Sequence, residues 1–505
     1  MTPDKLQNQR NLDARFAGGL AWTAGTKWAT QILTWTSLLA VAHLLSGSDY
    51  GVGEMAGVLT NTSNVLAEFG IGTAVLHMPE LSRKTLVQLN TFSCLLCAGI
   101  FALASLAAPW VAAFFHSDHL AIFVVNNSLL LFTGLQAVPM GLLARDMDYR
   151  RLSLLEAATV TVQSVCTILT AWLGWGYWAL FAGNAAGRLT GTILVCFWKP
   201  AGFAWPRWNE IRRPAELGRQ TAIGRIAGAL YSQADGIVVG RLLGEAALGN
   251  YRIAMTLASS PAEKVSSLLM RTATPLFANI KDDLAQVRRY YRTLVELLSL
   301  LVIPMMVGLA IVAPLAVPLV FGSNWAPAVD PVRWLALFMI VRTLSTLSEQ
   351  VLISQQLTRF TMRISIFSAV VMPVAFVIGA QQQGMGGVAA AWIFASPLTL
   401  IPLTLILLPT IQLPFRQYAA TLLPSVVGST AMGLALLVLR GWLPSASQSP
   451  KIALALQIML GAAVYAAVVM GFFGETVRRY IHFFQDMRAH SQRPAPSPKT
   501  NTEQS

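Results

Sequence analysis

Charged side chains are scarce in this sequence. Asp, Glu, Lys and Arg make up only 12% of its 505 residues, whereas soluble proteins contain about 25%. A separate soluble domain is missing as well, because apolar runs follow one another from Leu20 to about Phe473 with only short polar breaks. A helix that spans a bilayer needs about 20 mostly apolar residues, so the scarcity of charge excludes an ordinary soluble protein.

Cysteine is also rare, and histidine nearly so. The sequence predicts neither a disulfide framework nor a redox pair, because all four cysteines lie inside apolar runs and are interpreted as packing residues: Cys94, Cys97, Cys166 and Cys196. His116 and His119 form a bare H-x-x-H in a short loop, which does not predict a metal site without further ligands. The pattern G-x-x-x-x-G-K-[ST] is absent, so we expect no ATP hydrolysis and no cofactor.

What the chain does contain is apolar sequence and a particular distribution of basic residues. Its residues are 55% hydrophobic and its mean hydropathy is +0.57, which predicts an all-α, polytopic membrane protein with about fourteen transmembrane helices. The net charge of +13 falls mainly in alternate loops. By the positive-inside rule both termini are cytoplasmic, and the excess of positive charge reflects topology and not nucleic-acid binding.

An internal repeat organises the chain. LLSGSDYG (44–51) and LLGEAALG (242–249) share their leucine and glycine spacing at an offset of 198 residues. Later matches keep the same order: APWVAAFFHSD resembles APLAVPLVFGSN, and GWGYWAL (174–180) resembles GMGGVAAAW (384–392). Two six-helix bundles that enter the membrane in the same direction are a recurring transporter design.

The predicted divisions follow from this repeat. We expect a cytoplasmic N-terminal segment (1–16), an N-lobe (17–198), a cytoplasmic linker (199–216), a C-lobe (217–410), two extra helices (411–473) and a largely disordered cytoplasmic tail (474–505).

Ionisable and polar residues interrupt the first two predicted helices of each half at helical spacing. The 198-residue offset aligns Lys27 with Arg225 and Glu54 with Arg252. Charges inside a membrane usually face a water-filled cavity or pair with one another, so we predict a cavity with an excess of cations. Its predicted substrate-binding cations are Lys27, Arg225 and Arg252; its carboxylates, candidates for ion coupling, are Glu54, Glu68, Asp235 and Glu263; and its polar lining is Gln31, Asn61, Asn64, Thr221, Ser232 and Thr256.

Structural interpretations remain open for several of these charges. Glu263 can form a local ion pair with Lys264 or Arg271, and Arg241 and Glu245 lie where a helix end is expected. Asp235 can equally be a helix cap or a buried packing group.

The sequence also resembles a known family. The stretches YGVGEMAGVLTNTSNVLAEFGIGTAVL, GLLARDMDYRRLSLLE and ADGIVVGRLLGEAALGNYRIAMTLASSPAEKVSSLLMRTATPLF are similar to Wzx-type polysaccharide transporters. These are oligosaccharide flippases of the MOP superfamily, which includes MATE exporters and lipid II flippases. The resemblance implies two MATE-like lobes around a cavity that is lined by the first, second, seventh and eighth helices. Its most specific part is the D-x-x-x-x-G-x-x-L-G-x-x-x-L-G-x-Y pattern from Asp235 to Tyr251.

The resemblance also implies a substrate and a location. The substrate would be an undecaprenyl-diphosphate-linked oligosaccharide, moved across the bacterial inner membrane for exopolysaccharide, O-antigen or capsule synthesis, and a polysaccharide polymerase and co-polymerase are possible partners. Two alternatives stay open: an ion-coupled MATE-like exporter of small molecules, and a polytopic polysaccharide polymerase or ligase. The basic residues favour the flippase over the exporter, and short external loops favour a transporter over an enzyme.

Overall fold

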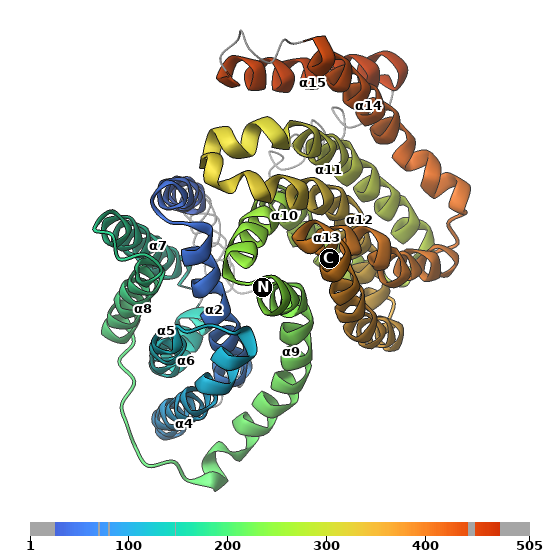
Figure 1. Ribbon diagram of the computed structural model, residues 1–505. Coiled ribbons are helices and arrows are strands. Elements are labelled where there is room, and N and C mark those ends of the chain that lie inside the picture. Colours follow the sequence, from blue (N-terminus) through green and yellow to red (C-terminus); the bar gives the residue numbers. More distant parts are fainter. Residues whose placement is uncertain (1–25, 69–70, 79–80, 147, 443–449, 475–505) are drawn as a thin grey trace, which may run out of the picture. The chain divides into compact units, whose positions relative to one another are not determined.

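The computed structural model describes residues 26–68, 71–78, 81–146, 148–442 and 450–474. The predicted N-terminal segment and all but the first residue of the predicted tail lie outside the described residues. Within the described part every regular element is a helix (Figure 1). The helices are residues 26–44, α2 (Gly47–Glu68), α3 (Ile71–His77), α4 (Arg83–Phe115), α5 (Leu120–Asn127), α6 (Leu129–Arg145), α7 (Tyr149–Trp172), α8 (Trp178–Trp198), α9 (Trp208–Leu243), α10 (Glu245–Asn279), α11 (Leu284–Phe321), the 3₁₀ turn η1 (Ser323–Ala328), α12 (Val329–Ser354), α13 (Thr358–Thr410), α14 (Phe415–Trp442) and α15 (Pro450–Phe472).

Nine helices of the described part are long and apolar enough to cross a membrane. The prediction of an all-α, multi-pass membrane protein is therefore confirmed, while the count of fourteen spans stays a prediction. Three long helices, α2, α9 and α10, do not meet this apolar composition. They are among the helices for which the sequence predicts polar, cavity-facing stripes.

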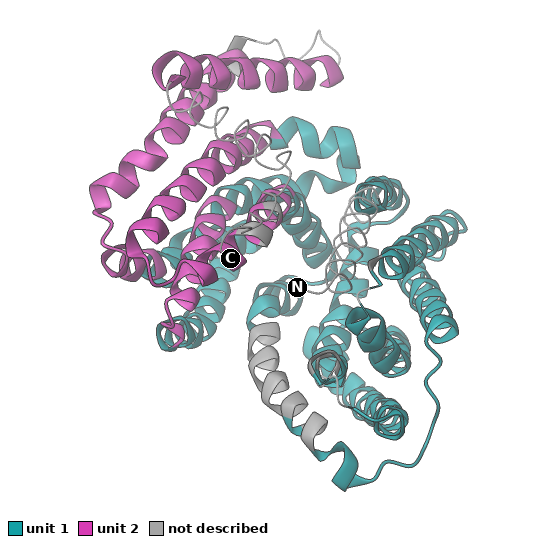
Figure 2. Cartoon of the chain, turned by 180° about the vertical axis from the view of Figure 1, so that it is seen from behind, with its two compact units in different colours: residues 1–260, 313–338, 359–402 teal, residues 261–312, 339–358, 403–505 magenta. Residues whose placement is uncertain are grey.

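The chain forms two compact units (Figure 2). Unit 1 comprises residues 1–260, 313–338 and 359–402, and unit 2 comprises residues 261–312, 339–358 and 403–505. The division into an N-lobe, a C-lobe and two extra helices stays a prediction.

In unit 1, the ends of α2 and α10 approach each other through glycine. A Cβ atom at Gly51 would lie 1.8 Å from the carbonyl oxygen of Glu245, and one at Gly249 would lie 1.9 Å from that of Gly47. The offset of 198 residues turns the first contact into the second, since Gly51 corresponds to Gly249 and Gly47 to Glu245. Such reciprocal contacts are typical of a two-fold arrangement. Each glycine packs against the residue that is equivalent to the one its counterpart contacts.

Each member of a second pair of matched segments contains a glycine with positive φ. Gly174, between α7 and α8, has φ +79°, and Gly384, inside α13, has φ +60°. At Gln383 and Gly384 the α13 backbone leaves helical geometry, so α13 consists of two helices that meet there. Glycine adopts positive φ without the steric cost that a side chain brings, which explains why both turns contain it.

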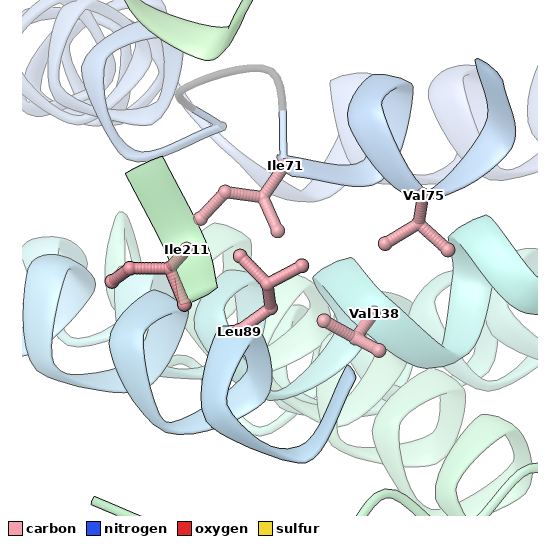
Figure 3. Packing of buried hydrophobic residues seen from close by; sticks show 5 residues of the cluster. All are labelled: Ile71, Val75, Leu89, Val138 and Ile211. Atoms are coloured by element: carbon pink, nitrogen blue, oxygen red, sulfur yellow. The ribbon is translucent and has the colours of Figure 1, made fainter. Parts of the chain in front are cut away.

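A cluster of aliphatic side chains joins α3, α4, α6 and α9 in unit 1. Ile71, Val75, Leu89, Val138 and Ile211 are each no more than 2% exposed and point toward one another (Figure 3). Beside this cluster, the segment before α9 lies along the start of α4, where the backbone N–H of residue 207 donates to the Gln88 side chain at 3.0 Å. The predicted linker is thus fixed to α4 over part of its length.

Candidate functional site

A charged cluster forms where α2, α9 and α10 meet in unit 1. Arg252 of α10 places its Nε 3.2 Å from Glu54 Oε2 of α2, and its Nη1 lies 3.9 Å from Asp235 Oδ1 of α9. Glu54 is the eighth residue of α2, so the cluster lies about 10 Å along the helix from its first residue. The structure therefore brings together three of the predicted site residues.

The Asp235 carboxylate is held rigidly. Its side chain is 1% exposed, its Oδ1 accepts the backbone N–H of Gly236 at 2.7 Å, and its Oδ2 accepts the Tyr251 hydroxyl at 2.9 Å. Trp392 Nε1 in turn donates to the Tyr251 oxygen at 3.0 Å. Buried polar groups are expensive unless they are satisfied in this way, so Asp235 behaves as a fixed counter-charge.

Trp392, the last residue of this series of hydrogen bonds, packs against two other aromatic rings. The Trp392 ring stacks on Phe338 with centroids 4.6 Å apart, and it lies 4.8 Å from the Phe376 ring. These contacts come from α12 and α13 and fix the direction in which the indole N–H points. On α9, Gly236 lies directly against the Arg252 side chain, because a Cβ atom at Gly236 would lie 2.2 Å from Arg252 Nη2. Only glycine leaves room for the guanidinium at this position.

Glu54 is bound less firmly than Asp235. Its side chain is 40% exposed, whereas that of Arg252 is 18% exposed. The Arg252 Nε is buried and has no hydrogen-bond acceptor among the described residues, although Glu54 lies at ion-pair distance. The pair is thus held by charge without an aligned hydrogen bond, and Glu54 is the more exposed and less firmly held partner.

The charge balance of this cluster is acidic, because two carboxylates face one guanidinium. A cavity with an excess of cations therefore depends on the remaining predicted cations. Lys27 is exposed on the first helix and makes no ion pair with any described residue, and Gln31 is half-buried. The side chains of Arg225, Thr221 and Glu68 lie outside the described residues, so their roles stay predictions.

The other predicted residues separate into different surroundings. Ser232 and Thr256 are exposed, and the Thr256 hydroxyl donates to the Arg252 carbonyl of its own helix at 2.9 Å. Glu263 belongs to unit 2, where its carboxylate lies 4.0 Å from Arg342, with both side chains largely exposed. Glu263 therefore forms an ion pair, as the structural interpretation expected, but with Arg342 of α12 instead of Lys264 or Arg271. The local sequence spacing does not indicate this partner.

The helix-end charges contact the loop that carries the H-x-x-H pattern. Arg241 Nη1 lies 2.7 Å from His116 Nε2, and Glu245 accepts the Ser117 hydroxyl at 2.8 Å. His119 Nε2 lies 3.9 Å from Glu245. The two histidines therefore contact different partners, and among the described residues no group of three His, Cys, Asp or Glu side chains could hold a metal.

Sequence reasoning missed Arg188, which lies within α8. Its Nη1 donates to Thr133 Oγ1 of α6 at 3.2 Å, and Thr133 Oγ1 donates to Asn64 Oδ1 of α2 at 3.0 Å. Asn64 is half-buried and Asn61 is exposed. A basic residue in the middle of an otherwise apolar span was the available signal, but Arg188 lies outside the helices with polar stripes.

Unit 2 contains an apolar cavity of about 540 Å³ between α11, α14 and α15. Its lining includes Leu301, Met305, Met432, Ile458 and Tyr465. The Tyr465 hydroxyl donates to the Leu300 carbonyl at 2.8 Å, so the polar group of this wall is satisfied. Such a lining suits a hydrocarbon chain better than a polar ligand.

These features define an integral, multi-pass membrane protein in which α2 and α10 make reciprocal contacts and, with α9, carry a charged cluster. The chain belongs to the polysaccharide biosynthesis protein family, whose sequence profile matches residues 40–330.

Individual relatives cover most of the chain at low identity. The lipopolysaccharide biosynthesis protein WzxC of Escherichia coli K12 is 23% identical over 452 residues, which are 82% of this chain and 88% of the relative. The teichuronic acid biosynthesis protein TuaB of Bacillus subtilis 168 is 21% identical over 478 residues, 92% of this chain and 97% of the relative. Among solved structures, the lipid II flippase MurJ in an inward closed conformation matches with a TM-score of 0.69 and 13% identity, covering 90% of this chain and 99% of that one. That likeness establishes the fold.

Proposed function

We propose that this protein is a flippase that moves undecaprenyl-diphosphate-linked oligosaccharide units from the cytoplasmic to the periplasmic leaflet of the bacterial inner membrane, with both of its termini cytoplasmic. The observation that carries the proposal is Arg252, a guanidinium in a predicted transmembrane helix, whose partner Glu54 is 40% exposed and forms no aligned hydrogen bond with it. Membership of a polysaccharide biosynthesis family, relatives named for cell-surface polymer synthesis and the flippase fold support it.

The geometry suggests how a diphosphate would bind. Arginine binds phosphate oxygens through two parallel N–H donors, and the Arg252 Nε has a donor without an acceptor among the described residues. A phosphate oxygen would take this donor and displace Glu54, while Asp235 keeps the guanidinium in place through its contact at 3.9 Å.

The exchange would also couple binding to motion. The Glu54–Arg252 pair joins α2 to α10, which are equivalent helices of the two halves. Release of Glu54 removes this attraction and leaves a carboxylate that can bind a proton or Na⁺. Transport would then proceed by alternating access, driven by an ion gradient or by the gradient of the substrate itself. A polysaccharide polymerase and co-polymerase would receive the unit outside.

One observation favours a second candidate, an ion-coupled exporter of cationic small molecules. Two carboxylates face one guanidinium in the cluster, and an acid-rich site attracts cations. Lys27 and Arg225 oppose this alternative if they line the same cavity.

Deletion of the gene distinguishes the flippase from the exporter. We expect lipid-linked units to accumulate in the cytoplasmic leaflet, where an impermeant glycosidase or lectin cannot reach them in intact spheroplasts. Wild type and the control Arg333→Gln, which removes one charge of an exposed ion pair at 3.8 Å, should restore export, and Arg252→Gln should not. Normal export in the deletion strain together with increased sensitivity to cationic drugs would replace the flippase with the exporter.

A further inference from the structure

A network of polar side chains connects α2, α6, α7 and α8 of unit 1, apart from the charged cluster. Arg188 donates to Thr133 at 3.2 Å, and Thr133 donates to Asn64 at 3.0 Å. Asn184 lies one helical turn before Arg188, and its Oδ1 accepts Gln163 Nε2 at 2.8 Å. These side chains lie inside helices that are long and apolar enough to cross a membrane, with the exception of the more polar α2. The network therefore marks a polar face within an apolar lobe.

Two amides on this face are exposed. Asn61, one turn before Asn64, makes no hydrogen bond with any described residue, and neither do the N–H groups of Asn184. An unpaired amide in contact with hydrocarbon costs several kcal/mol, so these groups must meet water or a ligand. Leu189 and Ile193, on a different face of α8, are exposed and apolar, which identifies that face as the one suited to lipid.

The α2 and α8 helices, which carry the exposed amides, run in the same direction and are bridged by one side chain of α6. The Tyr177 backbone N–H donates to Asp49 at 3.0 Å near the start of both helices. Further along both helices, Thr133 bridges Asn64 and Arg188. Asn61 and Asn184 each lie about one helical turn, or 5 Å, before the residue of their own helix that takes part in this bridge.

This polar face continues the face of α2 that carries the charged cluster. Asn61 follows Glu54 by seven residues, which returns to nearly the same side of a helix about 10 Å further along. Glu54 contacts Arg252. One molecule lying along this face could therefore contact Arg252 with one end and the amides with the other.

We propose that Asn61, Asn64, Asn184 and Arg188 form a saccharide subsite, distinct from the Arg252 site for the diphosphate. Sugar hydroxyls both donate and accept hydrogen bonds. Amide side chains offer both functions, and a guanidinium adds donors in a fixed plane. The subsite selects the sugar part of the substrate, and this inference rests on the proposed flippase function.

The test separates the two parts of the substrate. Purified protein in nanodiscs is titrated with undecaprenyl diphosphate and, separately, with the glycosylated undecaprenyl diphosphates extracted from a strain that lacks the gene, with native mass spectrometry as the readout. We expect Arg188→Gln and Asn184→Leu to weaken binding of the glycosylated lipid by about tenfold or more, the size of one hydrogen bond to a charged group, and to leave binding of undecaprenyl diphosphate within about twofold. Arg252→Gln should weaken binding of both lipids.

Thr190→Val is the matched control on α8, because the Thr190 hydroxyl donates only to the Ala186 carbonyl of its own helix, at 2.8 Å. It should bind both lipids as wild type does, and thermal unfolding of each variant confirms that it is folded. Equal loss of both lipids in a folded Arg188→Gln variant, or no loss of either, would overturn the subsite and leave the flippase standing. Failure of the wild-type protein to bind either lipid would instead count against the proposed function.

Discussion

The glycine contacts between α2 and α10 predict the effect of adding a single methyl group. A Cβ at Gly51 would lie 1.8 Å from the Glu245 carbonyl oxygen, whereas ordinary contacts begin at 3.4 Å. Gly51→Ala therefore requires the two helices to separate by roughly 1.6 Å, the difference between these distances. The obstacle is backbone, which cannot rotate aside, so this overpacking costs about 1–3 kcal/mol.

The overpacking in Gly51→Ala destabilises only the conformation in which the first turns of α2 and α10 are in contact. A difference of about 1–3 kcal/mol changes a two-state equilibrium by about 5- to 150-fold. The first turns are predicted to be external, so we expect Gly51→Ala to increase the population in which the external ends are apart. Access from outside to the cavity face of α2 should rise accordingly.

An accessibility assay measures this shift. Asn61, exposed on that face, is replaced by cysteine in a variant without the four native cysteines, and intact cells are treated with an impermeant maleimide. Gly51→Ala should raise the labelling rate severalfold. Gly99→Ala is the control, because a Cβ at Gly99 would meet nothing within 4 Å. Equal rates in the two variants, with both proteins inserted and folded, would refute the view that close contact of α2 and α10 shuts the external side.

Two further predictions concern stability. Tyr251→Phe removes the hydroxyl that donates to Asp235 and leaves a buried carboxylate oxygen without its partner, so the free energy of unfolding should fall by about 1–3 kcal/mol; thermal unfolding of purified protein checks this, and an unchanged midpoint would contradict it. The hydrogen bond from Lys84 holds the pKa of Glu210 below its ordinary value of 4.5. The contact of the linker with α4 should therefore be intact above that value and weaken as the pH falls through the lowered pKa. Hydrogen exchange of residues 202–212 against pH measures this, and Lys84→Gln should reduce the dependence, because Lys84 is the largest of the groups that lower the pKa of Glu210.

The sequence predicted those parts of the fold that repeat or alternate along the chain. Helical periodicity and apolar run length indicated an all-helical membrane protein, and the structure confirms it. The offset of 198 residues aligned Gly51 with Gly249 without showing that each glycine packs against the opposite helix. Such a contact depends on the packing of segments about 200 residues apart, which no local pattern records.

For the site as well, the sequence identified the residues but not the contacts between them. Helical spacing identified Glu54, Asp235 and Arg252 as polar residues of cavity-facing helices, but it left Asp235 open between ion coupling and packing. Its hydrogen bond to Tyr251, which Trp392 supports from 141 residues away, favours the packing role. Arg188 was overlooked because it lies outside the helices with polar stripes, and its link to Asn64 of α2 passes through Thr133 of α6.

The contact between Glu54 and Arg252 accounts for a difference in charge between equivalent positions of the two repeats. These residues are equivalent under the 198-residue offset, and they contact each other at 3.2 Å. Two equivalent residues can touch only beside the two-fold axis. In a dimer of identical halves that position would hold two like charges, which repel. A single chain with two divergent copies can place a carboxylate opposite a guanidinium there, and Asp235 fixes which half carries the cation, because its equivalent in the first half is Ser37. The asymmetry of the repeat thus allows α2 and α10 to meet through an ion pair of opposite charges at equivalent positions.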